Sequence, residues 1–282
     1  MTARPDAAPP HPGAAPPGVV LSPEGYAELF AEWARRPDAA PFAGGTALLR
    51  GTARPPAAVL SLEKIEEMRR VNRTERYLEI GAMVTLGAVV GLRKFVPSVL
   101  VQCLRGISGP HLRNMATIGG NVCCHLDSAA ALTALDAQYE LRGAESSRWV
   151  TAARFSPEPG PWSLGPGELL GRIRVPLESW DLSAYGKFEG GSAVFLARHQ
   201  KDMLADIRVI CRAAGRIWRD KDGENTLAGK RLPLGRRAAA AFAARWDAIL
   251  RGAEGAVGGA GGGLPRGELV GFIESSVGSL EE

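Results

Sequence analysis

Apolar residues recur along the first 180 positions with two spacings, one typical of amphipathic helices and the other of short strands. Spacings of three and four residues, as in Tyr26, Leu29, Phe30 and Trp33, indicate a helical face. The predicted helices cover residues 22–36, with Ser22 as N-cap and Pro23 in the first turn, a segment that begins at Ser61, and residues 85–95, 97–104 and 127–135. The predicted strands cover residues 59–60, 78–82, 138–142 and 168–176. Strands that alternate with helices predict an α/β or α+β domain.

The pattern changes after about residue 180. A strand is predicted at 207–211, an alanine-rich helix at 236–250, a glycine linker at 252–263 and a last helix at 266–280. A chain of 282 residues is long enough for two domains, so these segments predict a second, smaller unit. Residues 1–18 are dominated by proline and alanine, and we expect a disordered tail there.

Composition and charge narrow the class of protein. The hydrophobic content of 45% and the charged content of 23% are ordinary for a globular chain. The net charge is +4, but the arginines are scattered among acids without an aromatic and basic stripe, so no nucleic-acid partner is expected. No apolar run approaches the length of a membrane span, and the first residues lack the order of a secretory signal. We therefore expect a cytoplasmic protein without a membrane partner.

The four cysteines do not form the disulfide framework of a small secreted domain. The run Cys123-Cys124-His125 invites a metal hypothesis. A structural zinc or iron–sulfur site needs about four ligands, and no second pair with suitable spacing is present. We predict no metal site and interpret the thiols as reduced and partly buried.

Two glycine-rich stretches, residues 43–46 and 116–121, carry the candidate chemistry. Glycine pairs beside hydroxyl and amide side chains let backbone N–H groups converge on an anion. Neither stretch is a P-loop, and neither has the three glycines of the dinucleotide fingerprint. Each could be only a tight turn, which fits the first stretch. The second stretch is harder to explain that way, because Thr117, Asn121 and Asp127 add small polar groups to it.

With their flanking segments, these stretches resemble the flavin-binding subunit of molybdenum hydroxylases, the xanthine dehydrogenase and carbon monoxide dehydrogenase group. The resemblance is collinear over residues 19–190. Its most specific motif is Arg-Asn-x-Ala-Thr-Ile-Gly-Gly-Asn at 113–121. The other matching positions are residues 43–46 with Leu48 and Leu49, 80–82 with Thr85, 132 and 134–137, and 167–170 with Ile173 and Pro176.

The resemblance implies an α+β fold. A two-lobed FAD-binding domain of the vanillyl-alcohol-oxidase/MurB (PCMH) type would cover residues 19–178, with lobes at about 19–76 and 77–178. A small, shortened α+β domain of the carbon monoxide dehydrogenase flavoprotein type would follow at 179–282. FAD would lie between the lobes.

The resemblance also assigns site residues by position. The backbone of Ala43, Gly44, Gly45, Thr46 and Ala47, with the Thr46 hydroxyl, would hold the pyrophosphate from one side. Thr117, Gly119, Gly120 and Asn121 would meet it from the other, and the apolar contacts to the rings would come from Ile107, Ile118, Cys123 and Leu170. Asp127 would reach the ribityl chain or serve only as a helix cap. Lys187 would approach the flavin or be a surface lysine. No nucleophile–base pair is evident, as expected if the flavin performs the chemistry.

The function implied is electron transfer within a heteromeric enzyme. A molybdopterin-binding large subunit would hydroxylate the substrate, and a 2Fe-2S small subunit would pass electrons to FAD. The flavin would then reduce NAD or another acceptor. The chain departs from the family pattern in a loop about three residues short before Asp127, and in Ala47 where aspartate is frequent. These departures support an alternative, a flavin-free assembly or docking subunit. A stand-alone reductase of the MurB type would need a proton donor that we do not identify.

Overall fold

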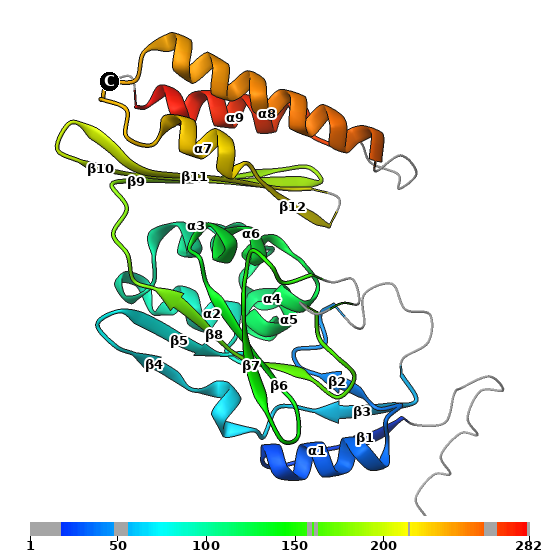
Figure 1. The fold of residues 1–282 in the computed structure, drawn as a ribbon. Helices are drawn as coiled ribbons and strands as arrows, with labels where there is room; N and C mark the ends of the chain where they lie inside the picture. The colour runs from blue at the N-terminus through cyan, green and yellow to red at the C-terminus, as the bar shows by residue number, and fades with distance from the viewer. Residues whose placement is uncertain are drawn as a thin grey trace, which may run out of the picture.

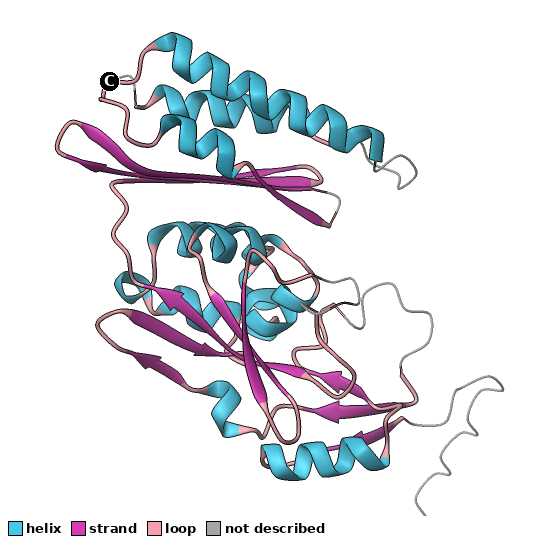
Figure 2. Ribbon diagram, viewed as in Figure 1, coloured by secondary structure: helices cyan, strands magenta, loops and turns pink. Residues whose placement is uncertain are grey.

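The computed structural model describes residues 18–47, 56–156, 160, 163–213, 215–256 and 264–280. The expected tail before residue 18, the pair Leu48-Leu49 and residues 257–263 of the expected linker lie outside these ranges. The described chain contains three sheets, and helices cover them as Figures 1 and 2 show. This mixture of parallel and antiparallel sheets with helices confirms the predicted α+β class.

The N-terminal sheet is parallel, with strand order β1-β3-β2. Its elements are β1 (Val19–Leu21), α1 (Tyr26–Arg35), β2 (Ala40–Phe42) and β3 (Ala58–Ser61). Helix α1 buries Leu29 and Phe30, as its apolar spacing predicts.

Two predicted helix starts in this part are wrong. Helix α1 begins at Tyr26 with Gly25 as N-cap, because Ser22 directly follows a strand that pairs with β3 and the chain needs the next residues to turn. Ser61 belongs to β3, where it pairs with Phe42, and only a single 3-10 turn (Glu66–Arg69) follows it.

The second sheet has five antiparallel strands in the order β4-β5-β8-β6-β7. Its strands are β4 (Val71–Arg73), β5 (Tyr77–Gly81), β6 (Gln138–Arg142), β7 (Ser147–Thr151) and β8 (Leu169–Pro176). The strands predicted at 78–82, 138–142 and 168–176 are thereby confirmed.

Helices fill the connection between β5 and β6 and pack on one face of this sheet (Figure 1). They are α2 (Leu86–Gly91), a 3-10 turn (Arg93–Phe95), α3 (Ser98–Gly106), α4 (Pro110–Met115), α5 (Ile118–Cys123) and α6 (Asp127–Ala134). Thr85 caps α2 as predicted, and its hydroxyl accepts a hydrogen bond from the Ala88 N–H at 3.2 Å. The N-cap of α6 is Leu126, so the predicted cap by Asp127 is wrong.

The third sheet is antiparallel, in the order β12-β11-β10-β9, and lies between two layers of helices (Figure 1). Its elements are β9 (Leu182–Phe188), β10 (Gly191–Gln200), β11 (Met203–Ala213), β12 (Arg216–Arg219), α7 (Lys221–Leu227), α8 (Arg236–Ala256) and α9 (Arg266–Gly278). Helix α8 runs six residues past the predicted end, into the expected glycine linker, where Ala253 is buried.

Both faces of the third sheet are buried. Val209 and Cys211 on β11 pack with Trp246 against the C-terminal helices. Ile210, on the opposite face, belongs to the core of the first two sheets, and α6 contacts this side of β11. The third sheet is therefore fixed to the part of the chain that carries the second glycine stretch. The domain boundaries at 18/19, 76/77 and 178/179 stay predictions.

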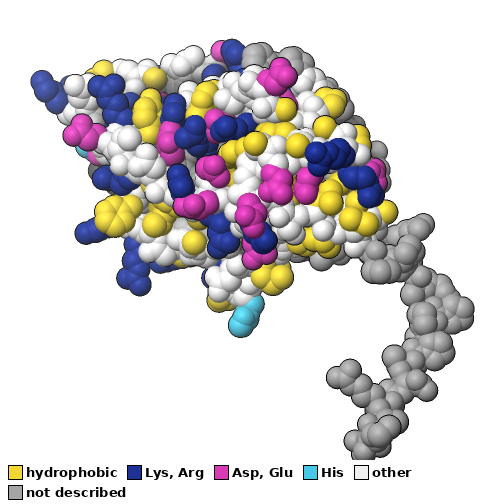
Figure 3. All heavy atoms as spheres, turned by 90° about the horizontal axis from the view of Figure 1, so that it is seen from below, with side chains coloured by type: hydrophobic (Ala, Val, Ile, Leu, Met, Phe, Trp, Pro, Cys, Tyr) yellow, Lys and Arg dark blue, Asp and Glu magenta, His cyan; other side chains and the backbone are white. Residues whose placement is uncertain are grey.

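Charge on the face seen in Figure 3 is mixed, with lysine and arginine interleaved among aspartate and glutamate. None of the helices in the described ranges has both the length and the hydropathy to span a bilayer.

Candidate functional site

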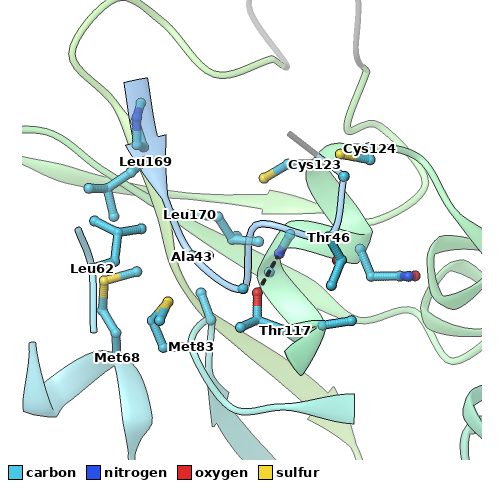
Figure 4. A pocket seen from close by; sticks show the side chains of 18 of the residues that line it. Ala43, Thr46, Leu62, Met68, Met83, Thr117, Cys123, Cys124, Leu169 and Leu170 are labelled. Carbon is cyan, nitrogen blue, oxygen red and sulfur yellow. Dashed lines mark hydrogen bonds between the residues drawn. The ribbon is translucent and has the colours of Figure 1, made fainter. Parts of the chain in front are cut away.

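The two glycine stretches meet at one cavity of about 540 Å³ (Figure 4). Eleven of the fifteen predicted site residues line it: Ala43, Gly44, Gly45, Thr46, Ala47, Thr117, Gly119, Gly120, Asn121, Cys123 and Leu170. The first five follow strand β2, and the next five lie on or just before α5. Segments about 75 residues apart in sequence thus form opposite walls of one site.

The first stretch approaches the second very closely. A Cβ atom built on Gly44 would lie 1.8 Å from the Met115 carbonyl oxygen, so only glycine fits there. Gly45 has a φ of 69°, in the left-handed region that favours glycine. The backbone N–H groups of residues 44–47 donate to no described residue. They are therefore available to bind an anionic group.

The second stretch is held by its own hydrogen bonds. The Thr117 hydroxyl accepts from the Gly120 N–H at 3.1 Å and caps α5, as the dashed line in Figure 4 shows. The Gly119 N–H donates to the Ala82 carbonyl at 2.9 Å, and a Cβ on Gly119 would lie 2.6 Å from the Ala82 Cβ. The backbone N–H groups of residues 118–121 are thus already paired, and the Thr117 hydroxyl proton remains free to be donated.

Asn121 adds a second side-chain donor to this wall. Its Oδ1 accepts from the backbone N–H of Ser128 at 3.2 Å and from the Ser128 hydroxyl at 2.5 Å. These bonds orient the amide, and Nδ2 donates to no described residue. A buried amide with one end fixed and the other unpaired suits recognition of a polar ligand.

The rest of the lining is largely apolar. Its larger apolar side chains are Leu62, Met68, Met83, Leu126, Leu164, Leu169 and Leu170. Glu168 is the one carboxylate among the described lining residues, and no lysine or arginine is among them. An anion bound here would be held mainly by neutral N–H and O–H groups.

The Glu168 carboxylate is held by hydrogen bonds within the protein, so it is not available to act as a base toward a ligand. Arg148 donates to both carboxylate oxygens, at 2.9 and 2.7 Å, and the Gly165 N–H donates at 2.8 Å. The bonds from Arg148 hold the pKa of Glu168 below its usual value. The pair fixes the loop before β8, which carries Leu164 in the cavity wall.

Cys123 and Cys124 also line the cavity. Burial raises the pKa of Cys123 to about 12 and that of Cys124 above its usual value, so both are neutral thiols. All four cysteines are free. Within the described ranges, no three or more His, Cys, Asp or Glu side chains are grouped to hold a metal ion.

Four predicted site residues are not among those that line the cavity. Ile118 is fully buried in the core, and Ile107 lies at the C-terminal end of α3, where its carbonyl accepts from Arg113 at 3.2 Å. Asp127 and Lys187 form an ion pair with each other at the third sheet. The role of all four as cofactor contacts stays a prediction.

Several lining residues were not predicted from the sequence, including Met68, Met83 and Leu126. Met68 comes from the 3-10 turn and Met83 from the turn after β5. Neither has a local signal, because a methionine in an apolar stretch is most often a core residue. Leu126 could have been found, since it follows the second stretch by a few residues.

The family described as the FAD binding domain in molybdopterin dehydrogenase matches residues 16–178. This match covers more than half of the 282 residues and both glycine stretches. The chain belongs to this family of FAD-binding domains. It is the family of the FAD-binding medium subunits of molybdenum hydroxylases, as the resemblance predicted.

Curated members show the same relation. The chain is 33% identical over 149 residues to the carbon monoxide dehydrogenase medium chain of Afipia carboxidovorans. The aligned residues cover 50% of this chain and 51% of that medium chain. It is 29% identical over 125 residues to a xanthine dehydrogenase FAD-binding subunit of Escherichia coli, 42% of each chain. The chain thus matches about half the length of these relatives.

Solved structures share the fold over almost the whole chain. A Cu,Mo-carbon monoxide dehydrogenase in its cyanide-inactivated form matches with a TM-score of 0.78 at 22% identity, over 94% of this chain and 97% of that chain. Quinoline 2-oxidoreductase from Pseudomonas putida matches with a TM-score of 0.78 at 20% identity, over the same shares. These likenesses confirm the fold, which includes the third sheet. That the C-terminal part is reduced relative to the family stays a prediction.

Proposed function

We propose that this chain is the FAD-binding, electron-transfer subunit of a heteromeric, xanthine dehydrogenase-like molybdenum hydroxylase. It would accept electrons from a 2Fe-2S small subunit and pass them to NAD or another acceptor. A molybdopterin-binding large subunit would oxidise the substrate. The observation that carries the proposal is the meeting of the two glycine stretches at one cavity that has unpaired donors and an apolar wall.

The donors and the apolar wall fit different parts of FAD. The free N–H groups of residues 44–47 would bind the pyrophosphate, with further donors from Thr117 and Asn121 on the opposite wall. The leucine and methionine side chains of the lining would cover the ring systems and exclude water. When bound, FAD supplies the uptake and release of electrons, and the protein supplies binding and orientation.

A purified full-length chain tests this directly. We expect it to carry the visible absorbance of flavin, or to take up one FAD per chain when titrated after flavin removal. Partner subunits encoded in neighbouring reading frames should co-purify with it. A chain that is folded by circular dichroism and neither carries nor takes up FAD would contradict the proposal.

One observation favours the alternative of a flavin-free assembly subunit. Asp127 and Lys187, both expected near the flavin, are paired with each other and do not line the cavity. The two functions differ in one result. An assembly subunit would co-purify with its partners without flavin, whereas stoichiometric FAD in the complex excludes it.

A further inference from the structure

Strand β11 presents two arginines to helix α6, one at each end of the helix. The Arg212 Nε donates to the His125 carbonyl at 2.6 Å, just before α6 begins. The Arg208 Nη1 donates to the Ala134 carbonyl at 2.8 Å, at the last residue of α6. Both side chains are largely buried, with 13% and 9% of their area exposed. The helix is thus clamped from one strand at two points.

Only the Arg212 end adjoins the cavity. Cys123, Cys124 and Leu126 line the cavity wall in the segment between α5 and α6, and His125 lies within that segment. His125 has a φ of 47°, which is uncommon for a residue with a side chain. Such a backbone conformation persists where contacts from the surrounding structure hold it. The Arg212 bond to its carbonyl is such a contact.

The same guanidinium also holds Asp127, the first residue of α6. Arg212 Nη1 lies 3.2 Å from Asp127 Oδ1, and the Ser192 hydroxyl donates to that oxygen at 3.1 Å. Lys187 pairs with the other oxygen, Oδ2. Strands β9, β10 and β11 therefore each contribute one group to a single buried carboxylate.

We infer that Arg212 is a positioning residue for the cofactor cavity: it fixes the wall formed by residues 123–126 from the third sheet. Arginine suits this role because its planar fork donates to the carbonyl and the carboxylate at once, whereas a lysine ammonium would reach one of them. The inference rests on the proposed FAD site for its consequence, a lower FAD affinity when the wall is loose. The positioning itself does not require bound FAD.

Arg208 provides the matched control, because it lies on the same strand, is similarly buried and donates to the other end of the same helix. We compare Arg212→Met with Arg208→Met in the full chain. Hydrogen exchange of the amides at residues 123–126 is measured without FAD, and the FAD dissociation constant is measured by titration. Unfolding temperatures are recorded for both variants.

We expect Arg212→Met to accelerate exchange at residues 123–126 by about tenfold or more. It should also raise the FAD dissociation constant roughly 2- to 30-fold. Arg208→Met should lower the unfolding temperature without either effect. Arg212→Lys is measured alongside in case the methionine variant does not fold, and it should show part of both effects.

Two results overturn the inference: wild-type exchange in the folded Arg212 variants, or equal changes in the Arg208 and Arg212 variants. The proposed function fails separately, if the wild-type chain takes up no FAD. The exchange measurement still decides the role of Arg212 in that case.

Discussion

Replacing Gly44 with alanine should separate the two walls of the cavity. The added Cβ would lie 1.8 Å from the Met115 carbonyl oxygen and 2.8 Å from the Met115 carbonyl carbon. Real Cβ atoms essentially never approach a heavy atom closer than 3.0 Å. One of the two backbones must therefore move by about 1.2 Å, the difference between 3.0 and 1.8 Å. Because both neighbours are backbone, no side chain can rotate away to relieve the clash.

The size of this shift sets the expected effect. A hydrogen bond to a charged group contributes about 1.5–3 kcal/mol, so its loss weakens binding roughly 10- to 100-fold. A hydrogen bond stretched from about 2.9 Å by that amount is no longer a hydrogen bond. We therefore expect Gly44→Ala to raise the FAD dissociation constant roughly 10- to 100-fold. Overpacking should also lower the free energy of unfolding by about 1–3 kcal/mol.

FAD titration of the folded chains measures the binding effect, and chemical denaturation measures the stability. Gly109→Ala is the control, because Gly109 lies six residues before Met115, has an ordinary φ of −77° and has nothing within 4 Å of an added Cβ. That variant should bind FAD as the wild type does. A folded Gly44→Ala chain with wild-type affinity would show that the contact between the two stretches does not build the site.

Three further changes have separate expected outcomes. Thr117→Ala and Thr85→Ala each remove the N-cap of a six-residue helix, so each should lower the free energy of unfolding by about 1 kcal/mol in chemical denaturation. Only Thr117 lines the cavity, so only Thr117→Ala should also weaken FAD binding. Equal FAD affinities of the two variants would refute the role of Thr117 as a ligand donor. Burial holds the pKa of His125 below its usual 6.5, so the unfolded chain takes up the proton first, and stability present above pH 6.5 is lost as the pH falls. The loss of stability at low pH should be smaller in His125→Phe, which keeps the stacking on Phe155. If His125→Phe has the same dependence of unfolding free energy on pH as the wild type, this role of His125 is contradicted. Gly271→Ala, at an exposed position inside α9, should raise the free energy of unfolding by about 0.5–1 kcal/mol without changing FAD affinity, and a lower stability would show that the helix cannot take a side chain there.

Strand β8 of the second sheet could be predicted because one of its faces is apolar and the other polar. Ile173 and Val175 are buried, while Arg172 and Arg174, which alternate with them along the strand, are half-exposed. Strand β10 could not be found this way. Its residues from Gly191 to Ala197 are buried on both faces, so the pattern has no strand period.

In the candidate site too, residues with a local sequence signal could be predicted, and residues placed by distant partners could not. Glycines beside small polar residues mark a close backbone approach, and both stretches were found from that signal. The position of Asp127 was not predictable, because it depends on partners 60, 65 and 85 residues away on the third sheet. The prediction that Asp127 caps a helix used only local sequence, whereas its ion pairs with the third sheet determine its position.

The measurement that tests the central claim most directly is the hydrogen-exchange footprint of FAD on the full chain. If both glycine stretches bind one FAD, adding it should slow exchange at residues 44–47 and at residues 117–126 together, with the same dependence on FAD concentration. Protection of only one stretch, or of neither, would contradict the account.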